Sequence, residues 1–231
     1  MDTLFNRVLP WSGGHFHYNS DIRRFYDSFR EYRIASVNNR FIELDQLEEF
    51  RLTRFIRDPR DLVVSGYFYH LKGREAWCNL PNPTERDWFF ANGVVPEGLR
   101  QNGSSYTTYL RSLSEEDGLL AELEFRFEHF ASMAKWPENH PAILTLRYED
   151  VIQDEVGAFM AMFDHYEFGS LERRLGLWLV ERFSLARRLQ EDQHIRNPAV
   201  GQWRQHFTPR VRNAFETQWR SLIDRLGYAA E

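Results

Sequence analysis

A short strand pattern that runs directly into a proline-led helix is the feature that most constrains the fold of this chain. Residues 52–56 (Leu-Thr-Arg-Phe-Ile) have the pattern of a strand, and Arg-Asp-Pro follows at residues 57–59. Proline is preorganised for the first position of a helix, so we expect a helix over residues 59–70. Residues 142–146 repeat this order, since a helical pattern to about residue 166 follows them. Strands that alternate with helices predict an α/β fold with a parallel sheet that helices cover on both faces.

The rest of the chain agrees with this fold class. We expect a short strand over residues 34–37, and further helices over residues 21–32 with Ser20 as cap, 115–130 after Ser114, 171–183, and 209–226 after Thr208. Residues 71–106 are irregular and contain several prolines and glycines, so we expect an insertion that faces the substrate. The length of 231 residues suits a single domain over residues 1–231.

Composition excludes several classes of protein. The chain has 29 basic and 34 acidic residues, a net charge of −5, which argues against a general binder of nucleic acid or of anionic membranes. Cys78 is the single cysteine, so it can form no disulfide within the chain and no thiolate-rich metal site. The sequence contains no apolar run of about 18 residues and no secretory leader pattern. We therefore expect a soluble, cytoplasmic protein with no metal, nucleic-acid or membrane partner, and its oligomeric state stays open.

The end of the first strand carries the sharpest chemical signal. An arginine, Arg57, stands at the carboxyl end of a strand where a helix begins, and the N–H groups and dipole of a helix start favour an anion. The guanidinium can bind a phosphate through two parallel hydrogen bonds, and Ser65, about two turns along the helix, can add a hydroxyl donor. The alternative is an ordinary strand-to-helix corner with a surface Arg–Asp pair, in which Asp58 and Asp61 only orient Arg57 and the helix start.

This motif resembles the sulfotransferases that use 3′-phosphoadenosine 5′-phosphosulfate (PAPS). In that family Arg-(Asn/Asp)-Pro-(Lys/Arg)-Asp follows a strand, and the arginine and a serine eight residues later bind the 3′-phosphate, as Arg57 and Ser65 would here. A second family motif, Arg-Lys-Gly followed by Gly-Asp-Trp, is similar to residues 196–203, with Asn, Pro and Gln in place of Lys, Gly and Asp. The resemblance implies that Arg196 and Gly201 belong to the same cofactor site. The segments 146–150 and 222–228 also resemble the family.

The resemblance implies a fold and a reaction. The fold would be the three-layer α/β/α sulfotransferase fold, which is similar to that of P-loop nucleotide hydrolases, with a parallel sheet. PAPS would be the co-substrate and 3′,5′-adenosine bisphosphate (PAP) the product, and the acceptor would be a small molecule or carbohydrate with a hydroxyl group. An ATP-dependent phosphotransferase is less well supported, because the sequence lacks a Gly-Lys-Ser/Thr phosphate loop.

The family's first strand-loop-helix unit is missing or altered. Its phosphate loop carries a lysine, but Lys72 and Lys135 are the only lysines, and residues 10–15 have the loop's shape with Trp11 in the lysine position. Residues 14–18 match better a Gly-His segment that family members carry near the acceptor hydroxyl. His15 would then be the general base, with His17 as the second candidate, unless the segment is an ordinary turn. In this placement the phosphate loop is lost or lies upstream of Met1, and an inactive sulfotransferase-like module for nucleotide binding or protein interaction is the alternative function.

Overall fold

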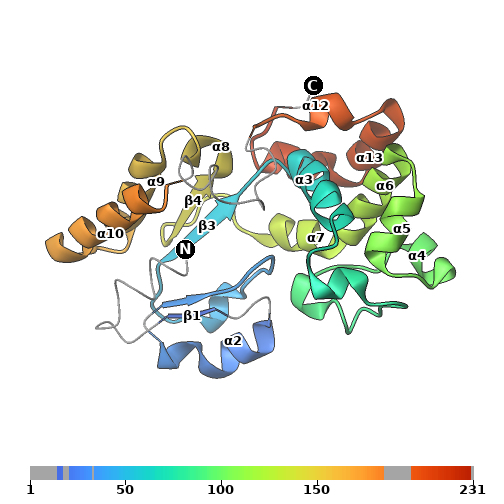
Figure 1. Cartoon of the computed structure of the whole chain (residues 1–231). Coiled ribbons are helices and arrows are strands. Elements are labelled where there is room, and N and C mark those ends of the chain that lie inside the picture. The colour runs from blue at the N-terminus through green and yellow to red at the C-terminus, as the bar shows by residue number, and fades with distance from the viewer. Residues whose placement is uncertain (1–14, 18–20, 33, 185–198, 230–231) are drawn as a thin grey trace.

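The computed structural model describes residues 15–17, 21–32, 34–184 and 199–229 (Figure 1). Its described strands form two parallel pairs. β3 (Leu52–Ile56) pairs with β4 (Ile143–Arg147), and β1 (His15–His17) pairs with β2 (Ile34–Ser36). The predicted α/β class with parallel strands is confirmed. Residues 10–14 of the segment with the shape of a phosphate loop lie outside the described residues.

The strand-to-helix corner forms as the sequence predicts. β3 ends at Ile56, and α3 (Pro59–Leu71) begins with its proline in the first turn. Asp58 is the N-cap, because its side chain accepts a hydrogen bond from the backbone N–H of Arg60. Aspartate is among the best N-caps, and proline needs no acceptor for the N–H that it lacks. Residues 56–59 therefore end the strand, cap the helix and start it.

The register of the central strand pair sets the geometry of the site. Leu52 lies opposite Ile143, and the pairing continues to Ile56 opposite Arg147. Because the strands are parallel, their carboxyl ends lie at the same edge, and Arg57 leaves β3 next to the residue that leaves β4. That residue is Tyr148, the first of α8 (Tyr148–Val151).

Helices lie on both sides of β3 and β4 (Figure 1). On one side are α8, α9 (Glu155–His165) and α10 (Ser170–Arg182), whose core packs against Leu144 and Leu146. On the other side Ile56 joins the largest core, and the helices there are α3, α4 (Glu97–Asn102), α5 (Tyr106–Ser112), α6 (Glu115–Phe125), α7 (Phe127–Lys135), α12 (Trp203–His206) and α13 (Pro209–Arg225). Thr208 caps α13 and Ser114 caps α6, as predicted.

The expected N-terminal helix is shorter than the sequence pattern suggests. α2 (Ile22–Ser28) is capped by Asp21, which accepts a hydrogen bond from the backbone N–H of Arg24, whereas Ser20 lies outside the described residues. The chain then tightens into a 3₁₀ turn (Phe29–Glu31). Asp21 serves the cap because its carboxylate stands one residue before the first helical residue, which is the N-cap position.

Two predicted long helices are each divided in two. The helix after Ser114 changes direction at Arg126, which separates α6 from α7. The helix after β4 stops at Val151, and Asp154 caps a new one, α9. In both cases the hydrophobic periodicity continues across the break, so the pattern alone does not reveal it.

The irregular segment 71–106 is a folded cover over the main core. It contains α4 and two 3₁₀ turns (Ala76–Asn79 and Phe89–Ala91). Trp88 is fully buried there, whereas Phe89 and Phe90 are exposed. The aromatic residues of this segment are thus divided between the core and the surface, and an orientation toward substrate stays a prediction.

Candidate functional site

Arg57 lies at the edge where β3 and β4 end. Its side chain is half-buried, and its guanidinium carbon lies 4.4 Å from the centre of the Tyr148 ring, a cation–π contact. The Nε and Nη2 atoms are buried, and neither has a hydrogen-bond acceptor within the part of the chain that the structure describes. The ring fixes the guanidinium plane while these N–H groups remain free to bind an oxyanion. We call this place, with Arg57 and the start of α3, the Arg57 corner.

Asp58 and Arg60 form a buried ion pair beside Arg57. Arg60 Nε donates to Asp58 Oδ1 at 2.9 Å, and Arg60 Nη2 donates to Asp58 Oδ2 at 2.7 Å. The Arg60 guanidinium also stacks on the indole of Trp203, 3.9 Å from the ring centre. The Asp58 carboxylate already accepts the backbone N–H of Arg60 in the first turn of α3. This N–H group is therefore not available to an external anion. An external anion here would therefore depend on Arg57 more than on the backbone N–H groups that the sequence suggested.

Asp61 ties the segment around Gly201 to α3. Its carboxylate is 1% exposed and accepts hydrogen bonds from the backbone N–H groups of Gly201 (2.6 Å) and Trp203 (3.0 Å). Burial raises the pKa of Asp61, although both N–H groups and Arg57 act in the opposite direction. Gly201 has a φ of +75°, a conformation that residues with a Cβ rarely adopt, which explains the glycine at this turn.

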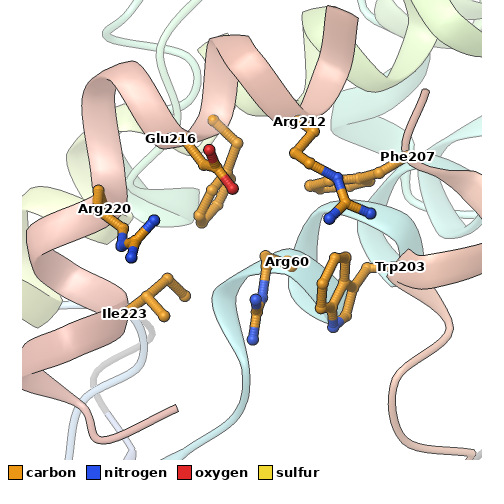
Figure 2. Close-up of a pocket in the computed structure, with 8 residues that line it drawn as sticks. Arg60, Trp203, Phe207, Arg212, Glu216, Arg220 and Ile223 are labelled. Carbon is orange, nitrogen blue, oxygen red and sulfur yellow. The ribbon is translucent and has the colours of Figure 1, made fainter. Parts of the chain in front are cut away.

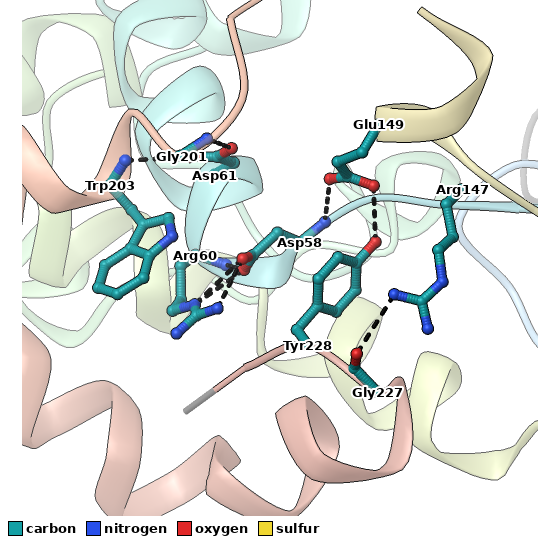
Figure 3. A network of polar contacts seen from close by, with 9 residues as sticks. All are labelled: Asp58, Arg60, Asp61, Arg147, Glu149, Gly201, Trp203, Gly227 and Tyr228. Carbon is teal, nitrogen blue, oxygen red and sulfur yellow. Dashed lines mark hydrogen bonds and ion pairs between the residues drawn. The ribbon is translucent and has the colours of Figure 1, made fainter. Parts of the chain in front are cut away.

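Glu149 joins two further segments to the same corner (Figure 3). One carboxylate oxygen accepts the backbone N–H of Asp58 (3.0 Å), and the other accepts the hydroxyl of Tyr228 (2.9 Å). Burial and the neighbouring Glu149 raise the pKa of Tyr228, so its hydroxyl stays protonated and donates. Arg147 stacks on the Tyr228 ring at 4.8 Å. The four sequence segments that carry the family resemblance thus meet at one place through hydrogen bonds and ring contacts.

The comparison with known families agrees with this convergence. Residues 48–227 match the family described as "Sulfotransferase domain". The chain belongs to the sulfotransferase domain family. No curated protein sequence matches it. Similar solved structures include the mouse sulfotransferase SULT7A1 complexed with PAP, which is 17% identical with a TM-score of 0.46, over 94% of this chain and 76% of that one.

A second similar structure is retinol dehydratase in complex with androsterone and inactive cofactor PAP. It is 20% identical with a TM-score of 0.43, and the match covers 98% of this chain and 66% of that one. This sulfotransferase domain therefore spans about two thirds of the length of that relative. Both likenesses are distant and concern the fold only.

The sequence-predicted site residues of this sulfotransferase domain fall into three groups. Arg57 and Ser65 lie at the start of α3 and two turns into it, and both are half-buried. Gly201 lies beside them, but its N–H group points to Asp61. Arg196 lies outside the described residues, so its place in the site stays a prediction.

The histidine segment forms a strand rather than a turn. Residues 15–17 are β1, in which His15 pairs with Ile34 and His17 with Ser36. Its strand conformation speaks against the alternative of an ordinary turn. Whether either histidine acts as a base stays a prediction.

A small pocket lies next to the Arg57 corner, between α3 and α13 (Figure 2). Its lining includes Arg60, Trp203 and Arg212, and its volume is about 10 Å³. This volume holds roughly one water molecule, so the pocket cannot hold a nucleotide or an acceptor.

A large cavity opens between β2, β3 and α7. Its volume is about 1210 Å³, and we call it the β2–β3 cavity. It is lined by residues 34–40, 42 and 47–56, by Phe25, Phe29, Arg30 and Tyr32, by His129, Ser132, Met133 and Trp136, and by Met162, Tyr166 and Phe168. The sequence does not display this cavity, because its walls come from segments that are up to more than a hundred residues apart. The one local signal was Arg54, a charged residue within a strand pattern.

Two general features of the described residues complete the picture. None of the described helices has both the length and the apolar character needed to cross a membrane. Within the same residues, no group of three or more His, Cys, Asp or Glu side chains is arranged to hold a metal ion.

Proposed function

We propose that this chain is a PAPS-dependent sulfotransferase that moves a sulfuryl group to an acceptor hydroxyl and releases PAP. The observation that carries the proposal is Arg57, a half-buried guanidinium on the Tyr148 ring whose Nε and Nη2 have no acceptor among the described residues. Buried N–H groups without an acceptor are costly, and a phosphate would accept hydrogen bonds from both and carry the opposite charge. Family membership and the convergence of its motifs support the same function.

The chain's residues have separate roles in this proposal. Arg57 binds the 3′-phosphate through two N–H groups, and the Ser65 hydroxyl donates to the same phosphate. Arg196 is the second cation at this phosphate. Gly201 acts through the backbone turn that Asp61 holds beside α3. Together these contacts would distinguish PAPS from adenosine 5′-phosphates, which lack a 3′-phosphate.

The transfer step needs a base and a stabilised leaving group. His15, or His17 in its place, takes the proton of the acceptor hydroxyl as its oxygen attacks sulfur, and the phosphate oxygen leaves with the bonding electrons of the broken S–O bond. Lys72 lies at the far end of α3 from Arg57, and Lys135 ends α7; both are exposed. Neither described lysine is placed to stabilise the leaving phosphate. We further propose that residues 1–231 form one cytoplasmic domain and that the acceptor is a small molecule or a carbohydrate.

Calorimetry with two nucleotides tests the 3′-phosphate site. We expect wild-type protein to bind PAP about 100-fold more tightly than adenosine 5′-phosphate, because charge-assisted hydrogen bonds contribute roughly 1.5–3 kcal/mol each. Arg57→Met should remove most of this preference and leave the binding of adenosine 5′-phosphate unchanged. Arg210→Met is the matched control, because Arg210 only pairs with Glu116 and Asp117 at the surface. Equal binding of the two nucleotides by folded wild-type protein would disprove the assignment.

Transfer from radiolabelled PAPS to a panel of hydroxyl acceptors separates the two candidate functions. Turnover that His15→Ala or His17→Ala abolishes supports the enzyme. The positions of Lys72 and Lys135 favour an inactive nucleotide-binding module as the second candidate. That function predicts tight binding of PAP with no transfer to any acceptor.

A further inference from the structure

We propose that the β2–β3 cavity binds an acceptor whose apolar or aromatic body carries an oxyanion, a carboxylate or a sulfate, and that Arg54 and Arg40 supply the positive charge for it. This inference rests on the proposed transferase function and names its class of acceptor. It follows from the size of the cavity, from its lining and from the unequal pairing of its charged side chains.

The size and apolar lining of the cavity fit the body of such a molecule. The volume of about 1210 Å³ exceeds that of a typical small-molecule site, roughly 300–1,000 Å³. Its apolar lining includes Phe25, Phe29, Ile42, Phe50, Trp136 and Met162. A surface of this kind favours an apolar or aromatic ligand body through the hydrophobic effect.

The arginines of the cavity differ in their pairing. Arg30, Arg40, Arg51 and Arg54 line it, against the acids Glu48 and Glu49. Arg30 lies 3.9 Å from Glu48, and Arg51 pairs with Glu167 and donates to the backbone carbonyl of His165. Arg40 and Arg54 form no ion pair within the described residues. The cavity wall therefore holds two cations that lack a neutralising partner there.

Of the two arginines, Arg54 is the stronger candidate to bind the oxyanion. It lies within β3, and its guanidinium carbon is 5.8 Å from the centre of the Trp136 ring. Its Nε is buried with no acceptor in the described part of the chain. Burial lowers the pKa of Arg54, and so does the positive charge of Arg225, whose own acid Glu138 lies 3.8 Å from it. An anion stabilises a guanidinium in these surroundings more than it stabilises an exposed guanidinium.

Arg40 has a similar environment. Its Nη2 donates to the backbone carbonyl of Phe89 (2.8 Å), and its guanidinium carbon lies 4.4 Å from that ring centre. These contacts fix the side chain but leave Nε buried without an acceptor among the described residues. Burial lowers the pKa of Arg40, and within the described parts of the chain the charge of Glu128 acts in the opposite direction.

The cavity ends one residue before the proposed donor site. Residues 47–56 line it up to Ile56, and Arg57 is the next residue. Arg54 and Arg57 are three residues apart on an extended chain, roughly 10 Å. An acceptor anchored by its oxyanion at Arg54 would thus lie within reach of the Arg57 corner.

Calorimetry with cholate and its methyl ester tests the inference without any nucleotide. The two probes share an apolar hydroxylated body, and only cholate carries a carboxylate. We expect wild-type protein to prefer cholate by about 100-fold, in line with one charge-assisted contact from each arginine. Arg54→Gln and Arg40→Gln should each reduce this preference at least about five-fold while leaving ester affinity within about two-fold. Arg51→Gln, in the same cavity but paired with Glu167, should retain the preference.

Each outcome decides the inference. Equal affinity of wild-type protein for both probes, no binding of either, or a cholate preference that survives both Arg54→Gln and Arg40→Gln would overturn it. Thermal unfolding identifies a variant that fails to fold, and the other arginine then carries the test. The PAP experiment on Arg57 is independent of this one. A preference for cholate without binding of PAP would therefore refute the transferase function and support the anion-binding cavity.

Discussion

Replacement of the buried Glu122 by glutamine should destabilise the protein severely. The carboxylate of Glu122 has no exposed surface and accepts from His70 Nδ1 (2.7 Å), the Tyr106 hydroxyl (2.8 Å) and Arg126 Nε (2.8 Å). Burial raises its pKa, but the nearby charges of His70 and Arg126 outweigh this, so the pKa is lowered overall. The carboxylate is therefore ionised at neutral pH and holds three donors from α3, α5 and the turn after α6.

The structure sets the magnitude. Removing one partner of a buried charge pair costs about 3–5 kcal/mol, and Glu122→Gln also turns an N–H₂ group toward donors. A domain of this size loses roughly 2–4 °C in Tm for each kcal/mol, so we expect a fall of about 10 °C. Glu116→Gln is the control, because its partner Arg210 is exposed and such pairs contribute about 0–1 kcal/mol.

Urea denaturation as a function of pH tests the reasoning. A carboxylate whose pKa is lowered by folding stabilises the protein above its unfolded-state pKa, and this stabilisation is lost as pH falls through the folded-state value. The gap in unfolding free energy between wild type and Glu122→Gln should therefore be full at pH 7 and shrink below about pH 4. A gap under about 1 kcal/mol at pH 7, or one independent of acid pH, would refute the assigned charge state.

Two further predictions concern neighbouring residues. Gly66→Ala should lower Tm in a thermal melt by several degrees, because a Cβ there would overlap with the side chains of Glu122 and Arg126; an unchanged Tm would contradict the packing. Burial and Arg126 lower the pKa of His129 to about 3 from 6.5, so its protonation favours the unfolded state as pH falls below about 6.5. From pH 7 to pH 5 the unfolding free energy of His129→Gln, measured by urea titration, should therefore rise by roughly 1–2 kcal/mol relative to that of wild type. A difference that stays constant with pH would count against a neutral His129.

Local signals were sufficient to predict the central unit. The run from Leu52 to Leu71 carries its own strand, cap and helix start, so β3, Asp58 and α3 follow from neighbouring residues alone. The same is true of the caps Ser114 and Thr208. The breaks at Arg126 and Asp154 were not predictable, because they depend on how each helix packs and the apolar spacing continues through them.

The candidate site was only partly predictable for a related reason. Arg57 and Ser65 belong to one continuous motif, which the sequence displays directly. The stacking of Tyr148 on Arg57 depends on the register that pairs Ile56 with Arg147, and no local pattern fixes that register. The β2–β3 cavity is even less local, since α7 and α9 supply parts of its wall. Contacts between segments so far apart in the sequence can be identified only once the fold is known.

The scarcity of lysine has a structural counterpart in the distribution of arginine. Arg54 and Arg57 lie within or directly after one strand, and each has buried N–H groups without an acceptor among the described residues. An arginine stays charged where burial would neutralise a lysine, so it can hold positive charge in half-buried places. If a phosphate binds at Arg57 and an acceptor oxyanion at Arg54, as we propose, each anion would supply an acceptor for the buried N–H groups of one of these two arginines.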